Sequence, residues 1–195
     1  MLYAVSWSAD GATLAVAGDS GVWLYNTSGF TSTPRLLKVP GGPAHDAAFN
    51  PASGILASVH HDGTLRLWDV STGGQRALLR DEMAQPAPLR ALAFSPDGTR
   101  IAAAGDDGMI RLWDVSSGVQ IASMGGHTGA VTALAFSPDG TLLASGGVDW
   151  SVRLWDVISA TLISVYEEHS GTVNAVIFTP DGTGIYSGGD DTQLH

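Results

Sequence analysis

Residue types that can build a charge-aligned nucleophile occur close together in the second half of the chain, at His127, Ser145 and Asp149. In serine hydrolases an Asp orients a His, and the His activates a Ser. The same three types recur at the same spacing 42 residues later, as His169, Ser187 and Asp191. A catalytic centre has no reason to repeat along a chain. The recurrence therefore favours a structural role for both sets.

This recurrence is part of a longer internal repeat. Residues 89–118 align without gaps to residues 131–160, and eighteen of the thirty positions are identical. Each copy holds an apolar segment such as VTALAF, a turn SPDG, and a segment that ends in LWD. Short apolar segments separated by Gly-bearing turns, without helical periodicity, predict four strands in each unit. A four-stranded sheet of about 42 residues needs copies of itself on both faces, and radial stacking fits this period.

The motifs of the repeat resemble those of the WD40-repeat family of β-propellers. The resemblance rests on the LWD endings at 67–69, 112–114 and 154–156, the Gly-His pair at 126–127, and the spacing of about 42 residues. It implies an all-β fold of four-stranded antiparallel blades around a central channel. It also implies a structural tetrad in each blade, in which an Asp accepts from the His, the His bonds the Ser, and the Ser bonds the Trp indole. The matching residues are His127, Ser145, Asp149 and Trp155 in one blade, and His169, Ser187 and Asp191 in the next.

The earlier units depart from this tetrad pattern. The second keeps Ser58, Asp62 and Trp68 but has Pro40 at the His position. In the third, Gln85 stands at the His position and Ala103 at the Ser position. In the first, Tyr25 stands at the Trp position, and Asp19 or Ser20 holds the Asp position. We expect the tetrad to be incomplete in these three units.

The repeat divides the chain into a single propeller segment. We expect blades at about 2–40, 43–82, 88–124 and 130–166, and an incomplete blade at 172–195 that ends inside its third strand. This gives about four and a half four-stranded antiparallel blades, in a ring that is incomplete within this chain. Further sequence, or self-association with another copy, would complete the ring.

The composition limits the classes of partner. The formal net charge is −10, and most of the acidic residues recur at fixed positions of the repeat. This charge, together with only nine Lys and Arg residues, argues against binding to nucleic acid or to anionic membranes. There is no Cys, which excludes disulfides and thiol chemistry.

Signals for targeting and for bound cofactors are also weak. The start of the chain lacks a signal-peptide pattern, and no apolar run is long enough for a membrane span, so the default expectation for its location is the cytoplasm. We expect no cofactor and no metal. His45, His60 and His61 could in principle approach a metal, but scattered surface histidines are the simpler interpretation.

The leading functional hypothesis is a non-catalytic scaffold that displays loops to a protein partner. In the family's geometry, the turn between the second and third strands lies on the docking face. Trp150 stands in this turn, where other units have Gly or Thr, and an exposed indole makes a good contact anchor. The residues before the turn Asp vary from unit to unit on the same face, as selective recognition requires. These variable positions hold His61, Asp106, Val148 and Asp190.

Two alternatives stay open. One is an enzyme with its site in the channel mouth, but at the inner ends of the first strands only Arg90 and Asn174 are unusual, which is too little for a mechanism. The other is a regulatory or tethering propeller tail of a longer protein, such as a bacterial signalling protein. The fold alone does not decide among these, because propellers host many functions.

Overall fold

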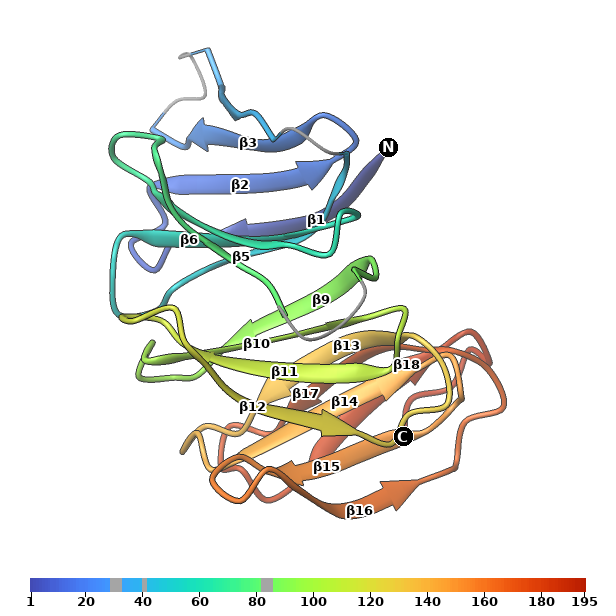
Figure 1. Cartoon of the computed structure of the whole chain (residues 1–195). Helices are drawn as coiled ribbons and strands as arrows, with labels where there is room; N and C mark the ends of the chain where they lie inside the picture. The colour runs from blue at the N-terminus through green and yellow to red at the C-terminus, as the bar shows by residue number, and fades with distance from the viewer. Residues whose placement is uncertain (29–32, 40–41, 82–85) are drawn as a thin grey trace.

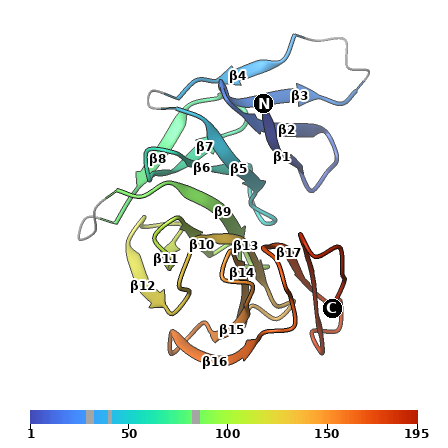
Figure 2. The same ribbon diagram turned by 90° about the vertical axis from the view of Figure 1, so that its right-hand side faces the viewer.

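The computed structural model describes residues 1–28, 33–39, 42–81 and 86–195. These residues form five antiparallel sheets that follow one another in an arc, each with its first strand on the inner side (Figures 1 and 2). Innermost strands of consecutive sheets contact each other along the whole arc. None of the described segments forms a helix with the length and apolarity that a membrane crossing requires. The all-β propeller architecture expected from the repeat is confirmed.

Each of the first four sheets contains four consecutive strands in sequence order, and we call the sheets blades one to five along the chain. The strands of blade one are β1 (Leu2–Trp7), β2 (Thr13–Gly18), β3 (Gly21–Asn26) and β4 (Arg35–Leu37); of blade two, β5 (Ala44–Phe49), β6 (Ile55–His60), β7 (Leu65–Asp69) and β8 (Gln75–Leu79); of blade three, β9 (Leu89–Phe94), β10 (Arg100–Gly105), β11 (Met109–Asp114) and β12 (Gln120–Gly125); of blade four, β13 (Val131–Phe136), β14 (Leu142–Gly147), β15 (Val152–Asp156) and β16 (Thr161–Tyr166); and of blade five, β17 (Val173–Phe178) and β18 (Ile185–Gly189).

The SPDG turn shows how the sequence closes the hairpin between the first two strands of a blade. In blade three, the carboxylate of Asp97 accepts hydrogen bonds from the Ser95 hydroxyl (2.6 Å) and from the Thr99 backbone N–H (3.0 Å). Gly98 follows with a φ of +70°, a conformation that side chains disfavour. The turn Asp therefore satisfies local backbone and hydroxyl groups, which explains why it recurs in the repeat.

The hydrophobic core lies between the blades, as one cluster for each pair of neighbours. Between blades three and four, for example, Ala102 and Ile110 of blade three pack with Val131, Leu143 and Trp155 of blade four. Equivalent clusters join blades one and two, two and three, and four and five. Each of blades two to four thus has its two faces covered by different neighbours, which is the physical reason why one unit alone is not stable.

Polar side chains on the innermost strands also tie neighbouring blades together. The Asp46 carboxylate of blade two accepts the Leu92 backbone N–H of blade three at 3.0 Å. The His45 imidazole Nδ1 lies 2.9 Å from the Leu89 carbonyl oxygen. From blade four, the Thr132 hydroxyl donates to the Val173 carbonyl of blade five. These contacts satisfy backbone groups at strand edges that face the channel rather than a sheet partner.

The first and fifth blades each leave one face uncovered. Val5 of blade one is 64% exposed, whereas Leu92, at the same position of blade three, is 5% exposed. Ile177 on the opposite, outward face of blade five is 59% exposed. Among the described residues, no hydrophobic cluster joins blade one to blade five. The ring is open, as expected from the count of repeats.

Candidate functional site

The polar chain of blade four crosses the blade from its entry loop to its third strand. His127 bonds Asp149 through Nδ1 (2.9 Å to Oδ2) and Ser145 through Nε2 (2.8 Å to Oγ). The Trp155 indole N–H donates to the same Ser145 hydroxyl oxygen at 2.8 Å. Asp149 also accepts the Thr128 backbone N–H at 3.0 Å. The structure thus brings together the four residues that the sequence assigned to the tetrad.

Electrostatics within this chain fix the protonation of its members. Burial lowers the pKa of His127, although the hydrogen bond to Asp149 opposes the shift. Burial would raise the pKa of Asp149, but the hydrogen bonds from Thr128 and His127 outweigh it, and the pKa is lowered. A neutral imidazole therefore donates from Nδ1 to an ionised carboxylate and accepts the Ser145 proton at Nε2.

This arrangement gives Ser145 no access to a substrate. Its side chain is fully buried, and its oxygen is held between the imidazole and the indole. A nucleophile must reach a reacting atom, and this hydroxyl faces only the two rings that hold it. The geometry can satisfy buried polar groups, but it cannot perform acyl transfer.

The first three members of this hydrogen-bonded chain, the Asp, the His and the Ser, recur in blade five. His169 bonds Asp191 through Nδ1 and Ser187 through Nε2, both at 2.8 Å. The Ser170 backbone N–H donates to Asp191 at 3.0 Å, as Thr128 does to Asp149 in blade four. Residues that are 42 positions apart in the sequence therefore make the same hydrogen bonds in the two blades.

Blade two builds its chain in a different way. The Ser58 hydroxyl accepts the Trp68 indole N–H at 2.8 Å, as in blade four, but its other partner is His60 Nε2 at 2.8 Å. His60 lies on the same strand as Ser58, and it is fully buried. Burial lowers the pKa of His60 to about 4, so the ring is neutral. The expectation that His60 is a surface histidine was wrong, because residues two apart on a strand share one face, and this face is buried here.

The remaining departures from the tetrad have simpler outcomes. Pro40 and Gln85 lie outside the described residues. In blade three, Ala103 and Trp113 are buried in the core without a serine between them. In blade one, the Trp23 indole N–H donates to the Ser20 hydroxyl at 3.3 Å.

A second set of side chains surrounds the channel mouth in pairs that sequence reasoning missed. In blades one, two, three and five, the second residue of the first strand lies beside the residue sixteen positions later, at the second hairpin turn. Tyr3 donates to Asp19 (2.8 Å), Arg90 forms an ion pair with Asp106 (2.9 Å from Nη2), Asn174 donates to Asp190 (2.5 Å), and the rings of His45 and His61 meet edge to face with centroids 5.6 Å apart. The spacing of sixteen recurs in the sequence and was the available signal.

These pairs change the interpretation of the variable positions on the docking face. Asp106 and Asp190 were expected to be partner-binding residues at positions that differ from blade to blade. Both carboxylates are held by the first strand of their own blade. Arg90 and Asn174, the two unusual residues at the channel mouth, are the partners that hold them. Both are therefore engaged in pairs with the carboxylates at the turn.

Blade four differs from the other blades at the same place. Val148 is 41% exposed and Trp150 is 52% exposed, so the hairpin turn presents two apolar side chains. Trp150 has a φ of +67°, where blades two and three have glycines with similar angles, Gly63 and Gly108. At these glycines a Cβ would lie within 2.9 Å of a backbone oxygen of the next entry loop. Trp150 therefore occupies a position that disfavours any side chain.

The channel mouth itself is a hollow of about 280 Å³ lined by the first strands. Its wall includes Asp46, where the other blades have Ala4, Ala91, Ala133 and Ala175. Burial raises the pKa of Asp46 to about 6, although the N–H groups of Leu92 and Ala47 oppose the shift. This replacement of an alanine was visible in the repeat and could have identified Asp46 as the one acidic residue in this position.

Comparisons with known proteins support the motif analysis. The family model described as "WD domain, G-beta repeat" matches residues 36–69, 82–114, 118–156 and 160–195, which is most of the chain. A comparison with curated proteins gave no match.

Proposed function

Because the chain belongs to the WD40-repeat family, whose repeats generally mediate contacts between proteins, we propose that it is a non-catalytic scaffold with a specific docking face. The face consists of the turns between second and third strands and the entry loops beside them. Its anchor is Trp150, together with Val148 of the same turn. The partner is a protein that buries this indole.

The observation that carries this proposal is the half-exposed indole of Trp150 in a turn of positive φ. A non-glycine residue with positive φ costs of order 1 kcal/mol or more, and a half-exposed indole gives little packing in return. Gly63 and Gly108 adopt the same turn conformation without this cost. Thr192 of blade five shares this conformation, with a φ of +63°, so the exposed indole is what distinguishes Trp150. Large aromatic side chains are typical anchors of protein interfaces.

The surroundings of Trp150 support selectivity as well. Blade three presents the Arg90–Asp106 ion pair on one side, and blade five presents Asn174 with Asp190 on the other. An apolar centre between polar groups that are already fixed resembles the core and rim of a protein interface. Because the pairs are preorganised, docking would require little further ordering of these side chains.

The test compares partner capture by the native chain with capture by Trp150→Gly. Glycine is the residue that two other blades use in this turn, so the fold is retained and the thermal melt stays the same or rises slightly. We expect recovery of the partner, measured by quantitative crosslinking from the source cells, to fall at least tenfold.

The matched control is Ile158→Ser. Ile158 is 79% exposed and lies in the turn that follows β15, whereas Trp150 lies in the turn that precedes this strand. The substitution therefore removes an exposed apolar side chain that is not on the docking face. Its partner recovery should equal that of the native chain. The proposal fails if Trp150→Gly retains the partner, or if Ile158→Ser loses it equally.

A further inference from the structure

In blades two to four, an arginine of the third strand faces the aspartate of the preceding turn. Arg66 lies 2.7 Å from Asp62, and Arg111 lies 2.6 Å from Asp107. In blade four, Arg153 Nη2 lies 3.7 Å from Asp149. The guanidinium supplies a positive charge beside a partly buried carboxylate, which stabilises its ionised form.

Blade five replaces this arginine by His195. Its backbone N–H and C=O pair with Ser187, as Arg153 is paired with Ser145 in blade four. The equivalent position therefore holds an imidazole, whose ring lies 4.5 Å from the His169 ring at an angle of 85°. One potential ligand atom from each of His169, Asp191 and His195 lies within 4.8 Å of the other two.

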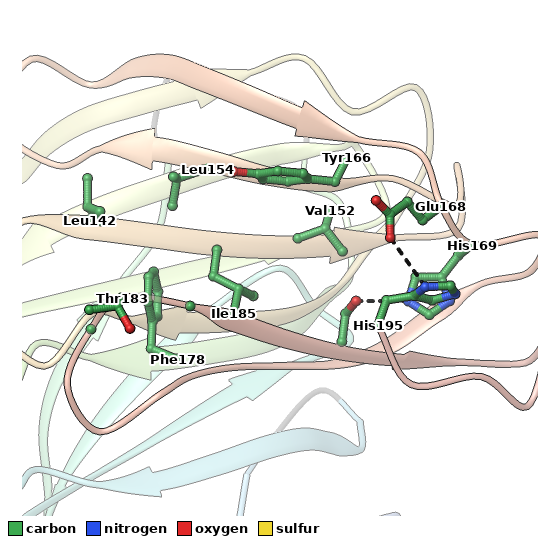
Figure 3. Close-up of a pocket in the computed structure, with 13 residues that line it drawn as sticks. Leu142, Val152, Leu154, Tyr166, Glu168, His169, Phe178, Thr183, Ile185 and His195 are labelled. Atoms are coloured by element: carbon green, nitrogen blue, oxygen red, sulfur yellow. Dashed lines mark hydrogen bonds and ion pairs between the residues drawn. The ribbon is translucent and has the colours of Figure 1, made fainter.

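The orientation of His195 is set by a carboxylate outside this group. Glu168 Oε2 lies 3.3 Å from His195 Nδ1, so Nδ1–H faces an acceptor (Figure 3). The other ring nitrogen, Nε2, is buried and has no hydrogen-bond partner. A histidine that donates one N–H to a carboxylate and leaves its other nitrogen bare is the arrangement that metal-ligating histidines adopt.

We propose that blade five binds a divalent transition-metal ion of the zinc class through His169 Nδ1, an oxygen of Asp191, and His195 Nε2. Two imidazoles and one carboxylate form a recognised zinc ligand set, with a fourth position for water. The ion supplies the positive charge that arginine gives in the preceding blades. Ligand atoms of a tetrahedral zinc site lie about 3.4 Å apart, so a rotation of His195 toward the other two ligands closes the site.

The proton balance of binding follows from the present hydrogen bonds. Without an ion, His169 Nδ1–H donates to Asp191, and Nε2 accepts from Ser187. Coordination through Nδ1 moves that proton to Nε2, so the ring stays neutral and Nε2–H then donates to Ser187 Oγ. His195 keeps its Nδ1–H on Glu168.

The ion can reach the site through a pocket of about 340 Å³ between blades four and five. Glu168, His169 and His195 line its polar end, and Tyr166, Phe178 and Ile185 lie along its apolar part (Figure 3). Access from solvent and a dry wall on one side are both needed for a stable metal site.

The experiment titrates the full chain, carrying no histidine tag, with Zn²⁺ by calorimetry and with Co²⁺ by visible absorption. We expect one ion per chain and the intense d–d bands of cobalt in a low-symmetry site with nitrogen ligands. His195→Arg installs the residue of blades two to four, so it reproduces their positive charge and keeps the fold but removes the ligand. It should lose the cobalt bands and weaken Zn²⁺ binding at least tenfold.

The second variant, His45→Ala with His61→Ala, controls for the other histidine pair on the surface. It should bind Zn²⁺ as the native chain does. The proposal is overturned if the native chain binds no ion, or if His195→Arg binds it as tightly, or if the double variant abolishes binding.

Discussion

At the scale of single residues, the tetrad of blade four satisfies buried polar groups that blade packing would otherwise leave unpaired. His127 connects the Asp149 carboxylate with the Ser145 hydroxyl, and Ser145 holds the Trp155 indole. Removing the imidazole leaves polar atoms without partners in a region that water does not reach. Such groups are costly to leave unpaired.

His127→Ala is therefore expected to lower the free energy of unfolding by about 1–3 kcal/mol. Chemical denaturation followed by near-UV circular dichroism measures the change. His61→Ala, which alters an exposed histidine outside any tetrad, is the control and should leave the midpoint unchanged. A midpoint equal to that of the native chain for His127→Ala would show that the polar chain carries no stability.

The residues of this tetrad could be predicted because two copies of the repeat have His, Ser and Asp at the same spacing and the family resemblance implies their roles. The role of His60, which bonds Ser58 in blade two in place of an entry-loop histidine, could not be predicted. Its role depends on the strand register that turns its side chain toward Ser58, and no other blade has a histidine there. The pairs around the channel mouth were missed for a similar reason, since a pairing sixteen residues apart requires the bulge that the hairpins contain.

At the scale of elements, the innermost strands are joined across blade boundaries by side chains that only some blades possess. Asp46 is the clearest case, because it holds the Leu92 N–H of the next strand at the cost of a buried carboxylate. Its folded pKa of about 6 lies above the ordinary value of 3.8. The ionised form is therefore less favourable in the folded chain than in the unfolded chain.

The sign of the pH effect follows from this shift. The contribution of Asp46 to stability is full below about pH 4 and is lost as the pH rises through about 6. Relative to Asp46→Ala, the native chain should lose about 2–3 kcal/mol of unfolding free energy between pH 4 and pH 7.5. Denaturant titrations of both chains across this range measure the difference.

A suitable control is Asp69→Asn. Hydrogen bonds from Ser71 and Thr72 lower the pKa of Asp69 to about 2, so its stabilising contribution is present above about pH 4 and is lost as the pH falls toward 2. This variant should follow the native pH dependence between pH 4 and pH 7.5. A constant offset between the native chain and Asp46→Ala over that range would contradict the assignment.

Strand order and the positions of the hairpin turns were predictable from the repeat, because Gly and Asp recur where the chain must reverse. The ties between innermost strands were not, since they depend on which side chains reach a neighbouring backbone. Thr132 and His45 occupy equivalent positions, yet one donates to a carbonyl of the next blade through a hydroxyl and the other through a ring nitrogen. Only the spatial arrangement distinguishes such contacts from ordinary exposed polar residues.

At the scale of the whole molecule, the open arc leaves two apolar faces of different kinds. Blade one exposes Val5 and Trp7, and blade five exposes Ile177 and Tyr186. Inside the arc, faces of these two kinds lie against each other at every blade boundary. The 195-residue chain is therefore expected to associate in solution, with the free face of one copy against that of another.

Val5→Glu should reduce this association, because a charge on the face disfavours burial. Multi-angle light scattering should give a mass above 20.1 kDa for the native chain, rising with concentration, and a lower mass for the variant. A similar substitution at Ile158, which lies in a turn outside both faces, should not change the mass. A native chain that stays monomeric at every concentration would refute the expected contact.

The third strands of the first four blades each contain a tryptophan, at Trp23, Trp68, Trp113 and Trp155. Each blade shares its core only with its immediate neighbours. Heat or denaturant should therefore unfold the blades one after another, beginning at the two ends of the arc. Fluorescence from a chain retaining a single indole would then report the local transition of one blade. If the unfolding midpoints of four such single-indole chains differ, they show how stability changes from blade to blade along the arc. The fluorescence of the native chain reports only the average over all its tryptophans.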